Sequence, residues 1–272
     1  MLTDAHCHPL DLIRVFPEAE KERKDLGVMA AASACDLQEF LYHENLARNS
    51  TKEKTSPLLC CFGIHPQLPG EKVKKSETFT EKDLNKTMAA LNKLCEAGKI
   101  AAIGECGFDL YRDEYKETET IQEKIFESHL ETAVKFNLPV VIHARRAMHK
   151  IFAYEKQLSK CKAVIFHTWP GTLEEGKSLL RRGINAYFSF GNVIMLNHKQ
   201  SIKCCSLLPA QRLLTETDAP YAPRRDKKFS SWTDLPLILE TAANLRSEAG
   251  NIITGKELEN QIDMNFMKAF LL

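Results

Sequence analysis

Leu2-Thr3-Asp4-Ala5-His6-Cys7-His8-Pro9, at the start of the chain, has the pattern of a short strand that ends in histidines. Side chains two residues apart lie on the same face of an extended strand, so His6 and His8 share a face with Asp4. Two imidazoles on one face at a strand end can supply half of a metal site. A chance pair of surface histidines is the alternative, because two-residue matches arise easily. Cys7 points to the opposite face, where we expect it to pack.

The same arrangement recurs along the chain, because short apolar runs repeatedly end in His, Glu or Asp. We expect eight strands, at 2–8, 28–34, 58–62, 100–103, 138–142, 163–166, 184–190 and 213–215. Helical patterns alternate with them, at 17–26, 37–47, 81–97, 120–136, 148–158, 173–182, 200–207, 232–248 and 256–271, and 67–80 is expected to be a lysine-bearing loop. This alternation predicts an α/β fold, a single (β/α)8 TIM barrel over residues 1–272.

Composition narrows the class of protein. The 272 residues are 44% hydrophobic, enough for a large core, and contain no apolar run long enough to span a membrane. The nine cysteines are odd in number and include two adjacent pairs, so we expect reduced thiols in an intracellular protein, nuclear or cytoplasmic. The net charge of +1 provides no general attraction for a polyanion, so any contact with nucleic acid must be local.

In a (β/α)8 barrel the active site lies at the carboxyl ends of the strands. The expected strand ends carry His6, His8, His65, Glu105, His143, His167 and Asp218. Clustered ionisable groups in a cleft indicate function more often than structure. We therefore predict that six of these residues hold metal: His6, His8, Glu105, His143, His167 and Asp218.

Four imidazoles and two carboxylates suffice for two divalent cations only if one carboxylate is shared. Glu105 is the predicted bridge. It lies between two pairs of histidines, His6 with His8 on the first strand and His143 with His167 on the fifth and sixth strands. Asp218 follows the eighth strand, which meets the first strand where the barrel closes. Imidazole ligands suit zinc, whereas magnesium or manganese prefers oxygen-rich shells and could serve during turnover.

These motifs resemble those of the TatD family of metal-dependent deoxyribonucleases, and most closely its vertebrate members. The resemblance spans nearly the whole chain, through Asp4-x-His6-x-His8, Gly63-Ile64-His65-Pro66, Gly104-Glu105-Cys106-Gly107-Phe108-Asp109, Gln122 with Phe126, Val141-Ile142-His143-Ala144-Arg145, His167 and Glu216-Thr217-Asp218-Ala219-Pro220-Tyr221. The chain departs from the family pattern at three places. The family usually has Leu where Phe108 stands, and the turn after His167 and the segment beyond Pro220 differ as well.

The resemblance implies a barrel that binds divalent metals and hydrolyses DNA phosphodiester bonds, from a 3′ end and also at abasic sites. The family's metal residues carry over onto the same six positions. The implied partner is DNA, single-stranded or at 3′ ends. We expect a monomer with no membrane contact and no obligate protein partner.

Two-metal hydrolysis is the predicted mechanism, in which a water bridging the ions attacks phosphorus in line. Glu105 and Asp218 are the catalytic candidates, with Asp218 as the proton acceptor; a helix N-cap is the alternative for Asp218. His65 and Arg145 are predicted to hold phosphate, with a strand cap and a surface arginine as their alternatives.

Further residues are predicted to support the site from its surroundings. Asp4 and Glu216 are expected to orient histidine ligands, although a buried polar role is equally open for Glu216. Trp169 could stack on a base or simply fill its loop. The basic segments 73–75 and 224–228 could touch phosphates, with solvated charge as the default.

Two other functions compete with a nuclease. A barrel amidohydrolase acting on small amides or esters can share the His-x-His opening and the late Asp. Such sites often bridge with a carboxylated Lys on the fourth strand, so Glu105 favours phosphoesters. The second rival is a non-catalytic barrel that binds metal or nucleic acid. Metal analysis together with oligonucleotide digestion separates the three.

Overall fold

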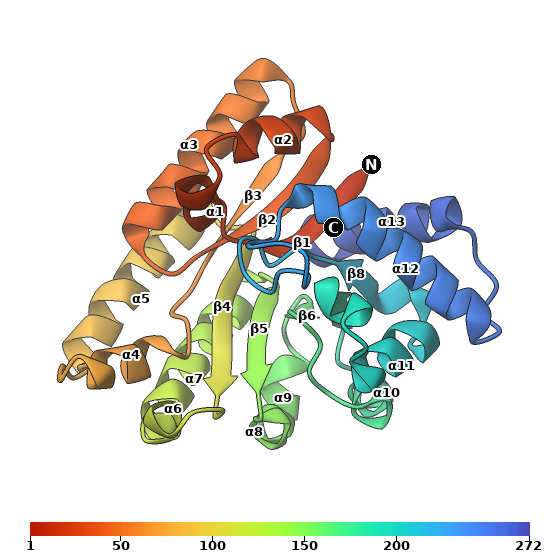
Figure 1. Ribbon diagram of the computed structural model, residues 1–272. Coiled ribbons are helices and arrows are strands. Elements are labelled where there is room, and N and C mark those ends of the chain that lie inside the picture. Colours follow the sequence, from red (N-terminus) through yellow and green to blue (C-terminus); the bar gives the residue numbers. More distant parts are fainter.

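A computed structural model describes all residues, 1–272, and has a nearly closed barrel of parallel strands at its centre (Figure 1). The strands follow one another round the sheet in chain order. They are β1 (Leu2–Cys7), β2 (Val28–Ala34), β3 (Leu58–Phe62), β4 (Ala102–Asp109), β5 (Val140–Arg145), β6 (Val164–Phe166), β7 (Ala186–Phe190) and β8 (Leu213–Thr215). The predicted (β/α)8 barrel is confirmed.

Helices surround the barrel on its outside. They are α1 (Pro9–Val15), α2 (Ala19–Asp25), α3 (Leu37–Glu53), α4 (Leu68–Lys74), α5 (Glu81–Glu96), α6 (Asp113–Lys116), α7 (Glu119–Phe136), α8 (Met148–Ala153), α9 (Glu155–Leu158), α10 (Leu173–Arg181), α11 (Lys199–Leu207), α12 (Leu235–Glu248) and α13 (Gly255–Phe270). Short 3-10 turns cover Asn192–Met195, Ala210–Arg212 and Trp232–Asp234.

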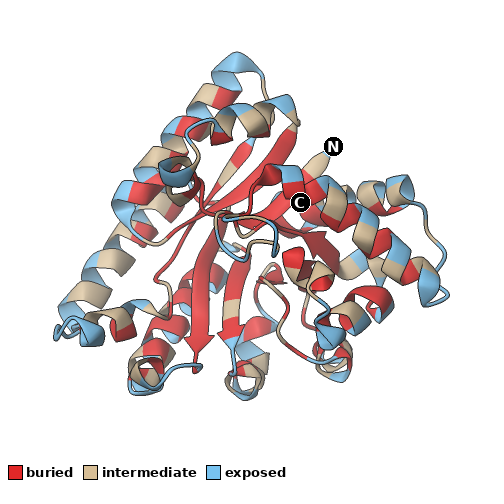
Figure 2. Ribbon diagram, in the orientation of Figure 1, coloured by how far each residue is buried: buried red, intermediate tan, exposed pale blue.

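The strands are buried on both faces, and exposed positions lie on the outer helices (Figure 2). Alternate strand residues therefore belong to two different packing layers. One set packs against the surrounding helices, as Phe166 and Phe188 do. The other set fills the barrel interior, where Phe266 and Phe270 of α13 pack against it. Its members include Ala5, Ala31, Cys61, Ala102, Val141, Ile165, Tyr187 and Leu214.

The barrel closes between β8 and β1 through a short set of hydrogen bonds. The backbone N–H of Asp218 donates to the carbonyl of His6 at 2.9 Å, and the N–H of His8 donates to Ala219 at 2.8 Å. The buried carboxylate of Asp4 accepts from the backbone N–H and the hydroxyl of Thr217, at 3.0 and 2.6 Å. These bonds fix the ends of the first and last strands beside each other.

Irregular register marks the two strands that bear His6 and Glu105. The β1–β2 pairing shifts between Asp4 and Cys7, and the β4–β5 pairing shifts between Ile103 and Cys106. A bulge re-aims side chains because one extra residue reverses the faces that follow it. Gly104 lies beside Glu105 at φ 142°, and a Cβ there would lie 2.4 Å from the carbonyl oxygen of Val141, so β4 and β5 approach too closely for a larger residue.

The structure corrects several expected boundaries. β4 does not end near residue 103 but continues to Asp109, so Glu105 lies within the strand. The expected loop at 67–80 contains α4, which begins just before Pro69, a residue favourable in a first helical turn. The helix expected at 148–158 is split into α8 and α9 at Tyr154.

All nine cysteines are free, and eight of them are buried. Cys7 packs in the core layer with Leu12, Val28 and Trp232, as expected from its face of the strand. None of the helices is both long enough and apolar enough to cross a membrane.

Candidate metal centre

A cavity of about 490 Å³ opens at the carboxyl ends of the strands. Seven of the residues predicted from sequence line it. They are His8, His65, Glu105, His143, Arg145, His167 and Asp218. His6 lies directly beneath, fully buried, with its Nε2 3.2 Å from Glu105 Oε2.

The alternation of the strands carries these side chains into the cavity. Val141 and Ile165 belong to the barrel interior, and two residues further along the same faces come His143 and His167. Leu214 is related to Glu216 in the same way. The interior face of the core thus continues directly into the site, and its side chains change there from apolar to ionisable.

The carboxylate of Glu105 lies between two groups of ligands. Its Oε2 is 3.2 Å from His6 Nε2 and 3.7 Å from His8 Nε2. The two Nε2 atoms are themselves 3.1 Å apart, and Asp218 Oδ1 lies 3.7 and 3.8 Å from them. This first group therefore collects His6, His8, Asp218 and one oxygen of Glu105.

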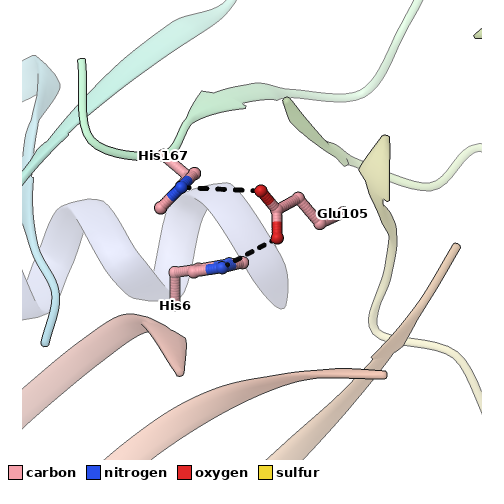
Figure 3. Close-up of side chains that lie close together, drawn as sticks. All are labelled: His6, Glu105 and His167. Atoms are coloured by element: carbon pink, nitrogen blue, oxygen red, sulfur yellow. Dashed lines mark ion pairs between the residues drawn. The ribbon is translucent and has the colours of Figure 1, made fainter. Parts of the chain in front are cut away.

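The other oxygen of Glu105 faces a second group. Its Oε1 lies 2.7 Å from His143 Nδ1, 3.3 Å from His65 Nε2 and 3.5 Å from His167 Nε2. Figure 3 shows His6 and His167 approaching different oxygens of the same carboxylate. One carboxylate therefore joins two sets of imidazole nitrogens.

The carboxylates and imidazoles of the site shift one another's pKa values. Burial alone would raise the pKa of Glu105, but His65, His6 and His167 outweigh it and hold that pKa well below its usual range. Burial would lower the pKa of His167, but the charges of Glu216 and Glu105 raise it to about 10. Burial, with the charges of Glu216 and Glu105, raises the pKa of Asp218 to about 8 against the opposing effect of His167.

The residues fit divalent cations. Burial and the neighbouring histidines lower the pKa values of His6 and His8, so both rings are neutral and offer lone pairs. Ser33 Oγ lies 3.1 Å from His6 Nδ1, which leaves His6 Nε2 for the centre of the site. Neutral imidazoles that converge with carboxylates form the donor set typical of zinc and related metals.

Glu216 contacts a proposed ligand, as the sequence prediction requires. Its Oε1 lies 3.1 Å from His167 Nδ1 and accepts from Thr168 N–H at 2.7 Å and from Thr168 Oγ1 at 2.5 Å. Asp4 contacts a proposed ligand through the main chain, because its carboxylate accepts from the backbone N–H of His6 at 3.2 Å and from Thr217 at the barrel closure. The prediction that Asp4 orients a histidine ligand stays a prediction.

Other predicted residues are placed as follows. Asp218 is not a helix N-cap, since the next helical turn begins only at Trp232. Arg145, predicted to hold phosphate, is the exposed last residue of β5 and lines the cavity. His65 is also predicted to hold phosphate, but its Nε2 is as close to Glu105 as the nitrogens of the proposed ligands are. Trp169 is 2% exposed and packs on Phe166 and Phe188, so of its two alternatives the structure supports filling the loop and not stacking on a base.

Half of the basic residues in the two segments pair with acids: Lys74, Arg224 and Lys227. Lys74 pairs with Glu71 at 2.6 Å, and Lys227 pairs with Asp234 at 2.7 Å. Solvated or paired surface charge, the default expectation, therefore describes these positions.

Sequence reasoning gave no role to Asp109 or Glu39. Asp109 Oδ2 lies 3.1 Å from His143 Nε2 and accepts from Gln67 at 2.7 Å. The position of Asp109 at the end of the Gly104–Asp109 motif was an available signal. Glu39 Oε1 is buried without a hydrogen-bond partner, 4.0 Å from His8 Nδ1, and burial raises the pKa of Glu39 to about 7. Nothing local to its helix indicates this contact.

A (β/α)8 barrel whose strand ends gather imidazoles and carboxylates in one cavity has the features of a metal-dependent hydrolase. Residues 3–271 match the family described as TatD related DNase. The chain is 35% identical over 191 residues to the 3′-5′ ssDNA/RNA exonuclease TatD of Pantoea ananatis, covering 66% of this chain and 69% of the relative. It is 27% identical over 253 residues to an uncharacterized metal-dependent hydrolase of Mycoplasma pneumoniae, covering 89% and 91%.

Solved structures share the fold. A TatD homologue from Escherichia coli superposes with a TM-score of 0.82 at 22% identity, covering 100% of this chain and 98% of the other. A TatD family hydrolase from Entamoeba histolytica gives 0.79 at 17% identity, covering 99% and 98%. The chain belongs to the TatD-related DNase family and is a metal-dependent hydrolase of the nuclease type. The resemblance to vertebrate members stays a prediction.

Proposed function

We propose that this protein is an exonuclease that removes nucleotides from the 3′ ends of single-stranded DNA, with two divalent cations shared by Glu105. The observation that carries the proposal is the position of this carboxylate, with one oxygen toward His6 at 3.2 Å and the other toward His143 at 2.7 Å. The relative from Pantoea ananatis, named as a 3′-5′ ssDNA/RNA exonuclease, supports the polarity and the single-stranded substrate.

His6, His8, Asp218 and Glu105 would hold one cation, and Glu105, His143 and His167 the other. His65 also faces the second group. Substitution of His65 will distinguish between a role as metal ligand and a role in holding phosphate. When bound, divalent cations lower the pKa of an attacking water and stabilise charge on the phosphodiester. Zinc suits the imidazoles, and magnesium or manganese could serve during turnover.

The chain's own groups supply the remaining steps. Arg145 can grip two oxygens of the phosphate at the mouth, because a planar guanidinium presents paired donors. Asp218 lines the cavity with 17% of its side chain exposed, and it is the proposed acceptor of the water's proton. Glu216 holds His167 in place through its Oε1.

The proposal also includes cleavage at abasic sites, a monomeric state and an intracellular location. The buried free thiols fit a reducing compartment. The amidohydrolase rival predicts that small amides or esters are cleaved while oligonucleotides are not.

Digestion of a 3′-labelled single-stranded oligonucleotide by Glu105→Gln tests the proposal. We expect turnover to fall roughly 10³-fold or more, because removal of a principal electrostatic group has an effect of this size in other enzymes. The variant should still fold, and its metal content should be reduced. Glu174→Gln is the matched control, because that side chain is 73% exposed on α10. Wild-type turnover by Glu105→Gln at normal metal content would refute the bridging role.

A further inference from the structure

A cationic and aromatic cluster lies at one lip of the cavity, formed by Tyr111, Arg145 and Arg146. The Arg145 guanidinium carbon is 3.8 Å from the centre of the Tyr111 ring, and that of Arg146 is 4.7 Å from it. All three residues are exposed, and Arg145 also lines the cavity. We call this group the arginine–tyrosine lip.

The lip is fixed to the metal centre by backbone contacts. Residues Asp109 and Arg145 are paired across β4 and β5, and Leu110 N–H donates to the Arg145 carbonyl at 2.9 Å. Tyr111 N–H donates to Asp109 Oδ1 at 2.9 Å, while the other oxygen of Asp109 lies 3.1 Å from His143 Nε2. One carboxylate thus ties the position of Tyr111 to a proposed ligand.

The cavity is also lined by acidic side chains whose charge is already paired. Asp11 and Glu71 each contact a basic side chain, Arg14 and Lys74 respectively. Neither Arg145 nor Arg146 takes part in any of the ion pairs of the structure. The positive charge of the lip is therefore available to an anion, and it is continuous with the cavity through Arg145.

Arg146 is held in an uncommon conformation. Its backbone is left-handed, with φ 56°, which residues other than glycine seldom adopt and which is concentrated at functional positions. In this conformation its guanidinium shares the Tyr111 ring with Arg145. Two cationic groups thus lie against the same aromatic ring.

We propose that the arginine–tyrosine lip receives the nucleotide next to the one held in the cavity. Its base stacks on the cluster while Arg146 contacts its phosphate. The inference rests on the proposed nuclease function and adds the residues that select a single strand. Aromatic rings and guanidinium planes bind unpaired bases of any sequence by stacking, whereas the bases of a duplex already stack on their neighbours.

The test measures binding by fluorescence anisotropy in the Glu105→Gln protein, which is expected not to digest its probe. Two labelled single-stranded oligothymidylates are compared, identical except that the second nucleotide from the 3′ end is abasic in one. Tyr111→Ala should weaken binding of the complete probe by about 5- to 150-fold and bring the two probes to similar affinity. Tyr111→Phe, which keeps the ring, should bind both probes as the parent does.

Salt dependence separates the arginine from the tyrosine. Arg146→Ala should make the slope of log affinity against log salt concentration shallower by roughly 0.7, the loss of one phosphate contact on a single strand, and Tyr111→Ala should not. Arg181→Ala is the matched control: Arg181 is exposed, takes part in no ion pair, and ends α10, so it lies at the opposite end of the barrel.

The outcomes distinguish the lip from the nuclease proposal. Equal weakening of both probes by Tyr111→Ala, no weakening of either, or no binding by the parent protein would overturn the lip. If the wild-type protein digests no oligonucleotide while these variants still change affinity as stated, the nuclease proposal fails and the lip remains a binding site for single strands.

Discussion

Histidines in this protein serve two different purposes, and their neighbours show which. Those of the metal centre point their nitrogens at carboxylates and at one another. His129, on α7, is instead fully buried among backbone groups: its Nδ1 lies 2.6 Å from the Ile125 carbonyl, and its Nε2 accepts from Ile64 N–H at 3.0 Å. Because Ile64 precedes His65, this ring holds the loop that brings His65 to the cavity.

The pH dependence of stability tests this assignment. Burial lowers the pKa of His129 to about 4, against about 6.5 in an unfolded chain, so only the unfolded state takes up this proton between those values. The free energy of unfolding should therefore fall as the pH drops from 6.5 to 4, by about 1.4 kcal/mol per pH unit for this group. His129→Gln cannot titrate, so urea titrations should show a shallower pH slope by that amount. An unchanged slope would mean that His129 is charged in the folded protein.

At the scale of single elements, the strands could be predicted where an apolar run ends in an ionisable residue. This pattern located His143 and His167, whose strands keep a regular alternation. The same pattern did not predict where β4 ends, because the motif around Glu105 contains two glycines and does not have the apolar pattern of a strand. Nor could it reveal the contacts of Ser33 or Glu39, which depend on how neighbouring elements are set against β1.

The role of Asp4 shows the same limit. The spacing Asp4-x-His6 predicts a shared face, but the register of β1 shifts after Asp4. The Asp4 carboxylate accepts from the backbone N–H of His6 and from Thr217 at the end of β8. The residue types needed at the site were thus predictable from sequence, while the partners of residues beside irregular backbone were not.

Thr217→Val tests the closure of the barrel. The substitution removes a hydroxyl that donates to Asp4 at 2.6 Å and leaves that buried carboxylate short of a donor. We expect the free energy of unfolding to fall by about 1–3 kcal/mol, the usual cost of such a group. Metal affinity should fall as well, because the same bonds hold His6 beside Asp218. Thr120→Val on the exposed side of α7 is the control, and equal stabilities of the two variants would contradict the role of this contact.

At the scale of the whole molecule, the barrel brings together residues from His6 to Asp218 at one end, and this convergence creates a concentration of buried charge. The net charge of the chain is only +1, so the function depends on local arrangement and not on a general field. The core keeps its apolar side chains below the cavity, and the cost of burying the carboxylates is met by the neighbouring histidines and, when bound, by cations.

Removal of metal should therefore lower thermal stability. Cations that bind only the folded state stabilise it by about 2.7 kcal/mol at a hundred times their dissociation constant. For a chain of this size that corresponds to roughly 5–10 °C in Tm. Differential scanning calorimetry before and after dialysis against a chelator should show this decrease, and zinc or manganese should restore the original Tm. A Tm insensitive to both treatments would argue that these side chains are stabilised without metal.

The most direct test of the account is an anomalous difference map from crystals soaked in manganese or zinc. We predict two peaks, one on each side of Glu105, at ligand distances of about 2.0–2.2 Å, the first toward His6 and His8 and the second toward His143 and His167. A map without peaks at this carboxylate, with the imidazoles turned to other partners, would contradict the shared-carboxylate centre on which the proposed function rests.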